Sequence, residues 1–487
     1  MSTPAIPLIQ GFHLFSIRTF VAVAAASLLA VGCTQKLPRP DLGSRYNHAA
    51  KYHGPERNPV IVIPGILGSK LVDENGTLIW GAFSGGSANP SRDEVARKVA
   101  LPMAHGVPLG ELQDTVRHDG ALDHARLSVF GLPVQSQAYA QILSTLGVGG
   151  YRDQQLAESG AVDYGSDHYT CYQFAYDWRR DNVENARLLY RFIQDRKVYV
   201  QQRQAQEFGG KPEDYDVTFD VVAHSMGGLL LRYMLRFGDQ DLPTDGSTPE
   251  VTWAGADLVD KAVLVGTPNA GTPKALMDLT RGVKFSPFHG AYSPAILSSM
   301  PSIYQLLPRD HHRSVALPNS QDSLFDPAVW QRYGWGLADP GRDDQLKVLL
   351  PDLPDAAARA KVAHDHLSKC LARAKAFHQA LDQQATVPDG LRISLFLGDG
   401  QSTVTHVDVS DNGGLSETAT TEGDGTVPRY SVIFDNREGQ DSGDQWTPYV
   451  PAPVAWHDIN ILFAEHLGLT SDSTFSNNLL FYLLDEE

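Results

Sequence analysis

A serine at position 225 stands in a sequence context suited to nucleophilic catalysis, Ala223-His224-Ser225-Met226-Gly227-Gly228. The apolar run 217–223 predicts a buried strand before it, and the pattern 227–237 predicts a helix after it. A serine on such a tight strand-to-helix turn presents its hydroxyl to substrate, and the helix amino terminus directs N–H groups at the reacting centre. The residues two before and two after the serine are small, as the sharp turn requires. We therefore predict Ser225 as the nucleophile of an acyl-enzyme reaction.

The hydroxyl of a serine needs a base to remove its proton and an acid to orient that base. In the α/β-hydrolase fold, these residues follow the nucleophile in the order acid, then histidine. Asp399 and Asp424 both lie on glycine-flanked turns after the serine, and spacing alone does not choose between them. His457 is expected where a loop enters the last helix, and His466 within that helix. Because the histidine of this fold follows the last strand, we predict His457 as the base.

The tetrahedral intermediate of acyl transfer carries an oxyanion, which needs hydrogen-bond donors. In this fold one donor is the N–H of the residue after the nucleophile, here Met226. The second comes from a loop after an early strand. The apolar run 59–64 predicts such a strand, and Pro64-Gly65-Ile66-Leu67-Gly68-Ser69 follows it. We predict the N–H of Ile66 as this donor; the alternative is a glycine-rich turn without a catalytic part.

Strand and helix patterns alternate along the chain, which predicts an α/β fold with a mostly parallel, doubly wound sheet. Residues 270–388 break this alternation, because they contain many prolines and aromatic residues and no parallel-strand pattern. We interpret them as an inserted cap. The first part of the hydrolase core is then expected at 58–269, with a lid insert at about 67–131. The second part of the core is expected at 389–487.

The amino terminus predicts export. An apolar run from Phe20 to Gly32 follows Arg18 and is too short to span a bilayer, so residues 1–32 are typical of a signal peptide. The sequence Ala30-Val31-Gly32-Cys33 resembles the lipobox of bacterial lipoproteins, and we predict lipidation of Cys33. The alternative is an ordinary cleaved signal. Residues 33–57 are polar and predict a tether. We expect a chain anchored by lipid to a bacterial membrane; Thr34, in place of aspartate after the cysteine, favours the outer membrane.

Composition limits the partners. The chain has 487 residues, of which 42% are hydrophobic, and a formal net charge of −17. This acidity argues against nucleic acid, whose phosphates require Lys and Arg. No residues show metal-ligand spacing, so neither a metal nor another cofactor is expected. Cys171 and Cys370 could pair in an oxidising compartment or remain buried thiols. These patterns do not determine the oligomeric state.

Four motifs occur in an order that resembles the lecithin:cholesterol acyltransferase family, over about residues 58–470. They are Pro64-Gly65-Ile66-Leu67-Gly68-Ser69, Tyr176-Asp177-Trp178-Arg179, Ala223-His224-Ser225-Met226-Gly227-Gly228 and Gly423-Asp424-Gly425-Thr426-Val427-Pro428. The resemblance implies Asp424, not Asp399, as the acid and His457 as the base. It also implies Ile66 and Met226 as the oxyanion donors.

The same resemblance implies residues that shape the substrate pocket. They are Leu67, Tyr176, Asp177, Trp178, Arg179, His224, Thr267 and Pro268. Asp177 and Arg179 could instead form a buried ion pair at the end of a strand. Animal members of the family close their lid with a disulfide, but residues 66–130 contain no cysteine pair, so the lid must be held otherwise. Trp80 could face lipid or anchor its loop.

These observations predict a serine-dependent enzyme that transfers acyl groups from lipid esters, either phospholipid or neutral lipid, to an alcohol or to water. A plain lipase or esterase that uses only water shares the same acyl-enzyme. A peptidase or amidase on this fold is a further alternative. A lipoprotein that binds lipid without catalysis is the alternative from a different class.

Overall fold

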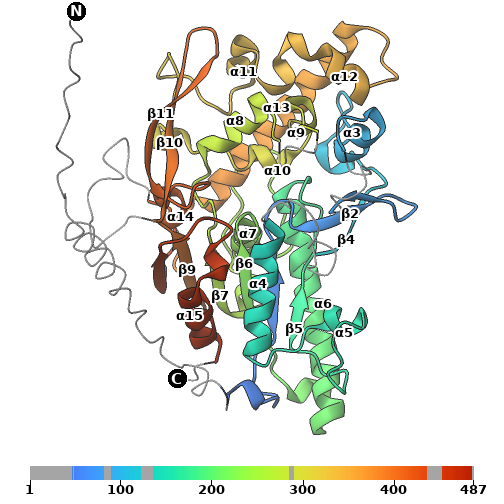
Figure 1. Ribbon diagram of the computed structural model, residues 1–487, viewed down its shortest axis with the longest axis vertical. Coiled ribbons are helices and arrows are strands. Elements are labelled where there is room, and N and C mark those ends of the chain that lie inside the picture. Colours follow the sequence, from blue (N-terminus) through green and yellow to red (C-terminus); the bar gives the residue numbers. More distant parts are fainter. Residues whose placement is uncertain are drawn as a thin grey trace, which may run out of the picture. The chain divides into compact units, whose positions relative to one another are not determined.

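The computed structural model describes residues 47, 49–81, 89–121, 135–284, 290–435 and 452–484, which belong to one compact unit, Tyr46–Glu487. Six parallel strands form its central sheet in the order β12-β9-β7-β6-β1-β5 (Figure 1). Their bounds are β1 Val60–Ile63, β5 Cys171–Gln173, β6 Phe219–His224, β7 Val259–Val265, β9 Arg392–Gly398 and β12 Asp458–Leu462. The predicted parallel α/β sheet is confirmed.

Both faces of this sheet are covered, which explains why its inner strands are apolar without alternation. In β1, Ile61 and Ile63 pack in one hydrophobic cluster with α6 (Asn182–Phe208) and α7 (Gly227–Phe237). Val60 and Val62 point the other way, into a cluster with α4 (Gln135–Val148) and α15 (Ser473–Leu484). The sheet is therefore the middle of three layers, and it holds the carboxyl ends of its strands at one edge.

The chain between β7 and β9, predicted as a cap, is mainly helical. Its longest element is α13, whose residues Phe377 and Leu381 are fully buried. A second sheet, with the order β11-β10-β8, adds one short strand from this segment to a hairpin that follows β9. The elements are α8 Pro273–Arg281, α9 Pro294–Leu297, α10 Pro301–Tyr304, η5 Asp310–His312, β8 Val315–Ala316, α11 Pro327–Tyr333, η6 Gly336–Ala338, η7 Pro340–Arg342, α12 Asp343–Leu349, α13 Ala356–Leu381, β10 Gln401–Val409 and β11 Leu415–Gly423.

The chain between β1 and α4, predicted to include the lid, contains a small antiparallel sheet of order β3-β2-β4. A buried arginine ties this segment to the core: Arg179 donates to the carbonyls of Lys98 and Val99 and pairs with Asp114 and Asp177. These contacts take the place of a disulfide. The elements are β2 Ser69–Val72, β3 Leu78–Trp80, α3 Asp93–Val99, η1 Leu109–Glu111 and β4 Arg117–Ala121.

One predicted element is wrong. The last helix was expected directly after His457, but the chain there forms β12, a parallel strand at the edge of the sheet. The sequence Asp458-Ile459-Asn460-Ile461-Leu462 alternates polar and apolar residues, as a strand with two different faces does. The remaining described elements are α5 Gln154–Glu158, η3 Pro212–Asp214, η4 Ala256–Leu258, α14 Arg429–Ile433 and η9 Leu469–Ser471. None of the helices in the described ranges is long and apolar enough to cross a membrane.

Candidate active site

Ser225 occupies the turn between β6 and α7 with a strained backbone. Its φ of 51° lies in the left-handed region, which is costly for a residue other than glycine. Two hydrogen bonds hold this conformation: the Ser225 N–H donates to Val265 O at 2.7 Å, and its carbonyl accepts from Gly228 N at 3.0 Å. The strain is thus offset by β7 on one side and the first turn of α7 on the other. The predicted strand-turn-helix context of the serine is confirmed.

Close packing around the turn explains why Gly65 and Gly227, which both lie next to Ser225 in space, are glycines. A Cβ added to Gly65 would lie 2.8 Å from the Cβ of Ser225, so the loop after β1 runs directly against the serine. A Cβ added to Gly227 would lie 2.6 Å from the carbonyl oxygen of Pro64. Side chains at either position would separate the nucleophile from that loop.

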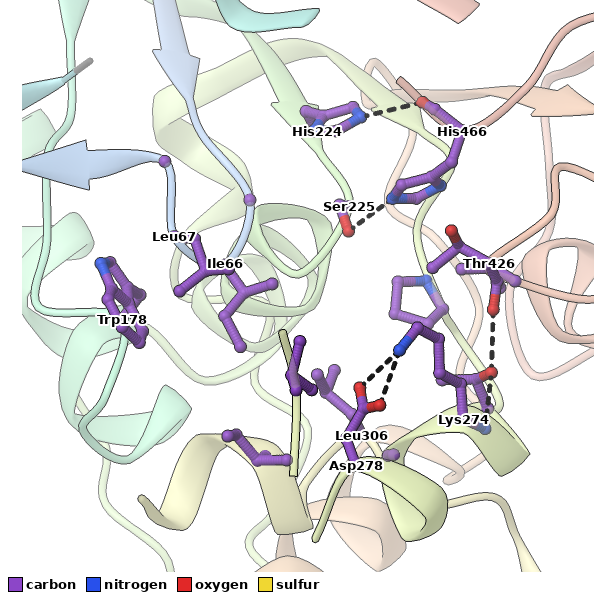
Figure 2. A pocket seen from close by; sticks show the side chains of 18 of the residues that line it. Ile66, Leu67, Trp178, His224, Ser225, Lys274, Asp278, Leu306, Thr426 and His466 are labelled. Atoms are coloured by element: carbon purple, nitrogen blue, oxygen red, sulfur yellow. Dashed lines mark hydrogen bonds and ion pairs between the residues drawn. The ribbon is translucent and has the colours of Figure 1, made fainter. Parts of the chain in front are cut away.

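The histidine that contacts the serine is His466. Its Nε2 lies 3.0 Å from Ser225 Oγ, and its Nδ1 lies 2.6 Å from Asp424 Oδ2. All three side chains are buried, although they come from separate loops at the carboxyl edge of the sheet. The backbone supports the arrangement, because His466 N donates to Asp424 O at 2.8 Å. Figure 2 shows His466 directed at Ser225.

The prediction of His457 as the base is therefore corrected. His457 precedes β12, pairs with Asp458 at 2.5 Å and leaves about half of its side chain exposed, at 49%. Five strand residues at about 3.3 Å each place it roughly 16 Å from the carboxyl end of β12. The rule that the histidine follows the last strand holds, but that strand begins after His457 and ends before His466.

Asp424 is well placed to orient this histidine. Its Oδ1 accepts from the N–H groups of Thr426 at 2.9 Å and Val427 at 2.6 Å, which leaves Oδ2 for His466. Asp399, the other aspartate considered, instead pairs with Arg429 at 2.9 Å. The geometry agrees with the assignment of Asp424 that the family resemblance implied.

Two backbone amides near the serine are available as oxyanion donors. Within the described part of the chain, neither the Ile66 N–H nor the Met226 N–H donates a hydrogen bond. Both belong to segments in contact with the nucleophile: Met226 follows it directly, and Ile66 follows Gly65. Two unpaired N–H groups beside a serine that contacts a histidine can stabilise a tetrahedral oxyanion.

His224, next to the nucleophile, packs against the histidine of the site. Its ring lies 5.1 Å from the ring of His466, centroid to centroid, and its Nε2 lies 3.4 Å from the His466 carbonyl oxygen. Burial lowers the pKa of His224 to about 3, and the neighbouring His466 adds to this effect. His224 is therefore neutral, so that it adds no positive charge next to His466.

A cavity opens in front of the serine, and its walls are mostly apolar (Figure 2). Of the pocket residues expected from sequence, Leu67, Trp178, His224 and Pro268 line it, as does Ile66. The expectation is corrected for Tyr176, Asp177, Arg179 and Thr267, which are buried outside the lining. Asp177 and Arg179 form the buried ion pair that was the alternative interpretation.

Much of the cavity wall was not predicted, because it comes from the helices and loops between β7 and β9. These residues are Lys274, Ala275, Asp278, Val283, Tyr292, Leu297, Met300, Ile303 and Leu306. Lys274 and Asp278 form the one charged pair in this wall, with Lys274 Nζ 2.6 Å from Asp278 Oδ1. Burial raises the pKa of Asp278. No sequence signal relates these positions to Ser225, since only tertiary folding brings them together.

Comparison with known proteins agrees with this description. Residues 134–340 match the family model described as lecithin:cholesterol acyltransferase. The predicted family resemblance is confirmed. The match supports an enzyme that acts on lipid acyl esters in a general sense, and it includes Ser225 and the helix α8 that carries Lys274. No curated protein matches the chain.

Two solved structures are similar to the chain at low sequence identity. One is titled "The crystal structure of Tle4-Tli4 complex", with a TM-score of 0.55 and 14% identity over 88% of this chain and 98% of that chain. Another is lipase 1 from Pelosinus fermentans, with a TM-score of 0.33 and 14% identity over 88% of this chain and 99% of that chain. The first supports the α/β-hydrolase fold.

Proposed function

We propose that this chain is a serine acyl-enzyme catalyst that cleaves lipid acyl esters and passes the acyl group to an alcohol or to water. The main support for the proposal is a pair of buried hydrogen bonds, one between Asp424 and His466 and one between His466 and Ser225. A serine with such a base and orienting acid, next to unpaired backbone N–H groups, has the parts that acyl transfer needs.

In the first half-reaction, His466 Nε2 removes the proton from Ser225 Oγ while Oγ attacks the carbonyl carbon of the ester. The oxygen of the tetrahedral intermediate accepts hydrogen bonds from the N–H groups of Ile66 and Met226. The C–O bond to the leaving alcohol then breaks, and His466 returns the proton to that oxygen. The acyl group remains as an ester on Ser225, and Asp424 stabilises the histidinium while it exists.

In the second half-reaction, an alcohol or a water molecule gives its proton to His466 and attacks the acyl carbon. Collapse of the second tetrahedral intermediate breaks the bond to Ser225 Oγ, which regains its proton from His466. The two acceptors differ only at this step. An alcohol gives a new ester, and water gives a fatty acid.

The cavity wall supports a lipid rather than a peptide as donor. Apolar side chains from three parts of the fold surround the space in front of the serine, among them Ile66, Leu297 and Met300. Such a wall stabilises an acyl chain through the burial of apolar surface. Lys274 and Asp278 form a polar patch on the same wall and are matched in charge, which suits a lipid with an uncharged or zwitterionic polar part.

Labelling and turnover of Ser225→Ala test the nucleophile. The variant should lose labelling by a fluorophosphonate probe and lose turnover of a long-chain acyl ester, while it keeps its thermal melting temperature. Labelling that persists in Ser225→Ala would reject the assignment. Absence of labelling in the unaltered chain would instead favour a lipoprotein that binds lipid without catalysis.

A second experiment separates the acceptors and the donor classes. Phospholipid with a labelled acyl chain is incubated with the enzyme, with and without a long-chain alcohol. We expect labelled alkyl ester when the alcohol is present; fatty acid alone in both reactions would show a plain lipase. Cleavage of an amide analogue in preference to the ester would favour an amidase and contradict the proposal.

We also propose that the chain is exported and anchored to a bacterial membrane, the outer one, through lipid on Cys33. The proposal depends on the residues around Cys33, which lie outside the described residues. An alkyne-tagged fatty acid fed to the producing cells should label the chain and fractionate it with membranes. Cys33→Ser should remove both the label and the membrane association; label retained in that variant would reject the site.

A further inference from the structure

The loop after β1, residues 64–69, is held by hydrogen bonds from buried aromatic side chains. The hydroxyl of Tyr176 donates to the carbonyl oxygen of Pro64 at 2.9 Å. The indole Nε1 of Trp80 donates to the carbonyl oxygen of Leu67 at 2.8 Å. Both side chains are fully buried, with an exposed fraction of 0%. A buried carbonyl that loses such a donor would be left unpaired, so these bonds fix the loop strongly.

The end of the loop is held in the same way by the motif that contains Tyr176. Trp178 Nε1 donates to the carbonyl oxygen of Ser69 at 3.3 Å, and the N–H of Tyr176 donates to Ser69 Oγ at 3.1 Å. Trp80 and Trp178 also pack edge to face, with ring centroids 5.4 Å apart. The three aromatic residues, Tyr176, Trp178 and Trp80, are referred to below as the aromatic brace.

The loop needs this support because its backbone is strained. Gly68 N donates to Gly65 O at 3.1 Å, which closes a four-residue turn with Leu67 in its third position. Leu67 has a φ of 65°, in the left-handed region that glycine or asparagine normally occupies in such a turn. A left-handed backbone is unfavourable for a leucine because its Cβ crowds the carbonyl oxygen. The bond from Trp80 is made to the carbonyl of this strained residue.

The geometry of this turn places its unpaired amide beside the nucleophile. Ile66 stands between Gly65, which packs against Ser225, and the strained Leu67. The peptide unit that joins Pro64 to Gly65 precedes this amide. Its carbonyl oxygen, on Pro64, lies against α7, because a Cβ added to Gly227 would lie 2.6 Å from that oxygen. Rotation of that peptide would move the Ile66 N–H, and the Tyr176 hydroxyl opposes the rotation.

We propose that Tyr176, together with the other residues of the aromatic brace, is a positioning residue for the oxyanion donor at Ile66. The inference rests on the proposed function, because it assigns to the brace a part in the same reaction. Tyr176 does not line the cavity and so is not expected to contact substrate. Its effect should appear in the transition state, where the oxyanion exists, and not in ground-state binding.

The test compares two variants that each remove one hydroxyl, one from β5 and one from the segment that follows it. Tyr176→Phe deletes the donor to Pro64. Tyr172→Phe is the matched control, since Tyr172 is equally buried and its hydroxyl donates to another backbone carbonyl, Tyr169 O, at 2.8 Å. Each variant loses one hydrogen bond to a backbone carbonyl, buried for Tyr176 and partly buried for Tyr172, so both melting temperatures should fall. Only Tyr176→Phe alters the loop beside Ser225.

Loss of a complete oxyanion donor lowers kcat by about 10²–10³-fold, and a displaced donor retains part of its effect. We therefore expect Tyr176→Phe to lower kcat on a long-chain acyl ester by about 10–100-fold, with KM changed less than about twofold. Affinity for a trifluoromethyl ketone analogue should fall in the same proportion as kcat/KM. Affinity for a non-cleavable ether lipid should not change. Tyr172→Phe should stay within about twofold of the unaltered enzyme in every measurement.

Equal kcat values for Tyr176→Phe and Tyr172→Phe would overturn the inference, as would a loss confined to KM. If Tyr176→Phe does not fold, Trp80→Phe serves as the second variant and should show the same selective loss of kcat. These outcomes are distinct from failure of the proposed function. That failure would appear as turnover retained by Ser225→Ala, whatever the brace variants do.

Discussion

Replacing Asp424 with asparagine changes one atom at the centre of the site, and the structure indicates which way the new amide must face. Oδ1 accepts from the buried turn amides of Thr426 and Val427, while Oδ2 accepts from His466 Nδ1. If the NH₂ group faced the turn, two backbone N–H groups would lose their acceptor, at a cost of about 1–3 kcal/mol each. The amide oxygen should therefore keep the Oδ1 position.

The NH₂ group then faces His466 Nδ1, which must become an acceptor. The imidazole proton moves to Nε2 and points at Ser225, so that the ring can no longer take the serine proton. The same substitution in a serine-protease triad lowers kcat by about 10⁴-fold. We expect a similar loss here, which corresponds to about 5.5 kcal/mol of transition-state stabilisation.

The assay measures kcat and KM on a chromogenic long-chain ester, with a thermal melt to confirm folding. Asp399→Asn is the matched control, because Asp399 lies on a neighbouring turn and pairs with Arg429 away from His466. It should remain within about threefold of the unaltered enzyme. A folded Asp424→Asn variant that keeps more than about one-hundredth of the activity would refute the reasoning, and a large loss in Asp399→Asn would transfer the role to that residue.

Three further predictions follow from the same contacts. His466→Gln should reduce kcat by at least about 10⁴-fold, whereas His457→Gln should change it less than about threefold; the opposite result in ester turnover would restore His457 as base. Burial raises the pKa of Asp220 from 3.8 to about 7 against the opposing charges of Lys261 and Arg392, with Asp260 adding to the rise. The folded state thus favours the protonated acid, and stability should be lost as pH rises from about 4 to about 7. Asp220→Asn removes that loss, so the variant should be more stable than the unaltered chain at pH 8 but not at pH 4. At pH 8 its free energy of unfolding should be higher by at most about 4 kcal/mol, and its melting temperature should be higher too. An equal difference at both pH values would contradict the prediction. Gly65→Ala places a methyl group 2.8 Å from Ser225 Cβ and should lower kcat by about 100-fold while the fold persists; unchanged turnover would show that the loop has room to move.

Local patterns predicted the parts of the fold that local physics controls. The inner strands are continuous apolar runs because both faces of the sheet are covered, and the helix after Ser225 occupies the predicted residues, Gly227–Phe237. The edge strand β12 was missed. Its exposed side carries two isoleucines, with exposed fractions of 41% for Ile459 and 51% for Ile461, in place of the polar residues usual there. The strand is also short enough to be taken for the start of a helix.

Because β12 was missed, His457 was predicted as the base in place of His466. His457 and His466 are nine residues apart, and each could follow the last strand until the limits of β12 are known. The sequence contained a usable signal, since alternation over Asp458–Ile461 indicates a strand and places His466 after it. Choosing Asp424 over Asp399 needed the family resemblance, because both lie on similar glycine-flanked turns.

Local sequence was enough to predict Ser225 as the candidate nucleophile, because a strand, a tight turn with small neighbours and a helix are all encoded within about twenty consecutive residues around it. The folded chain was needed to show which histidine contacts Ser225, which helices enclose the cavity and what holds the loop that carries Ile66. Those features join residues that are hundreds of positions apart, such as Ser225 with His466 and Pro64 with Tyr176. Their meeting depends on the order of strands in the sheet, which fixes the loops that share one edge.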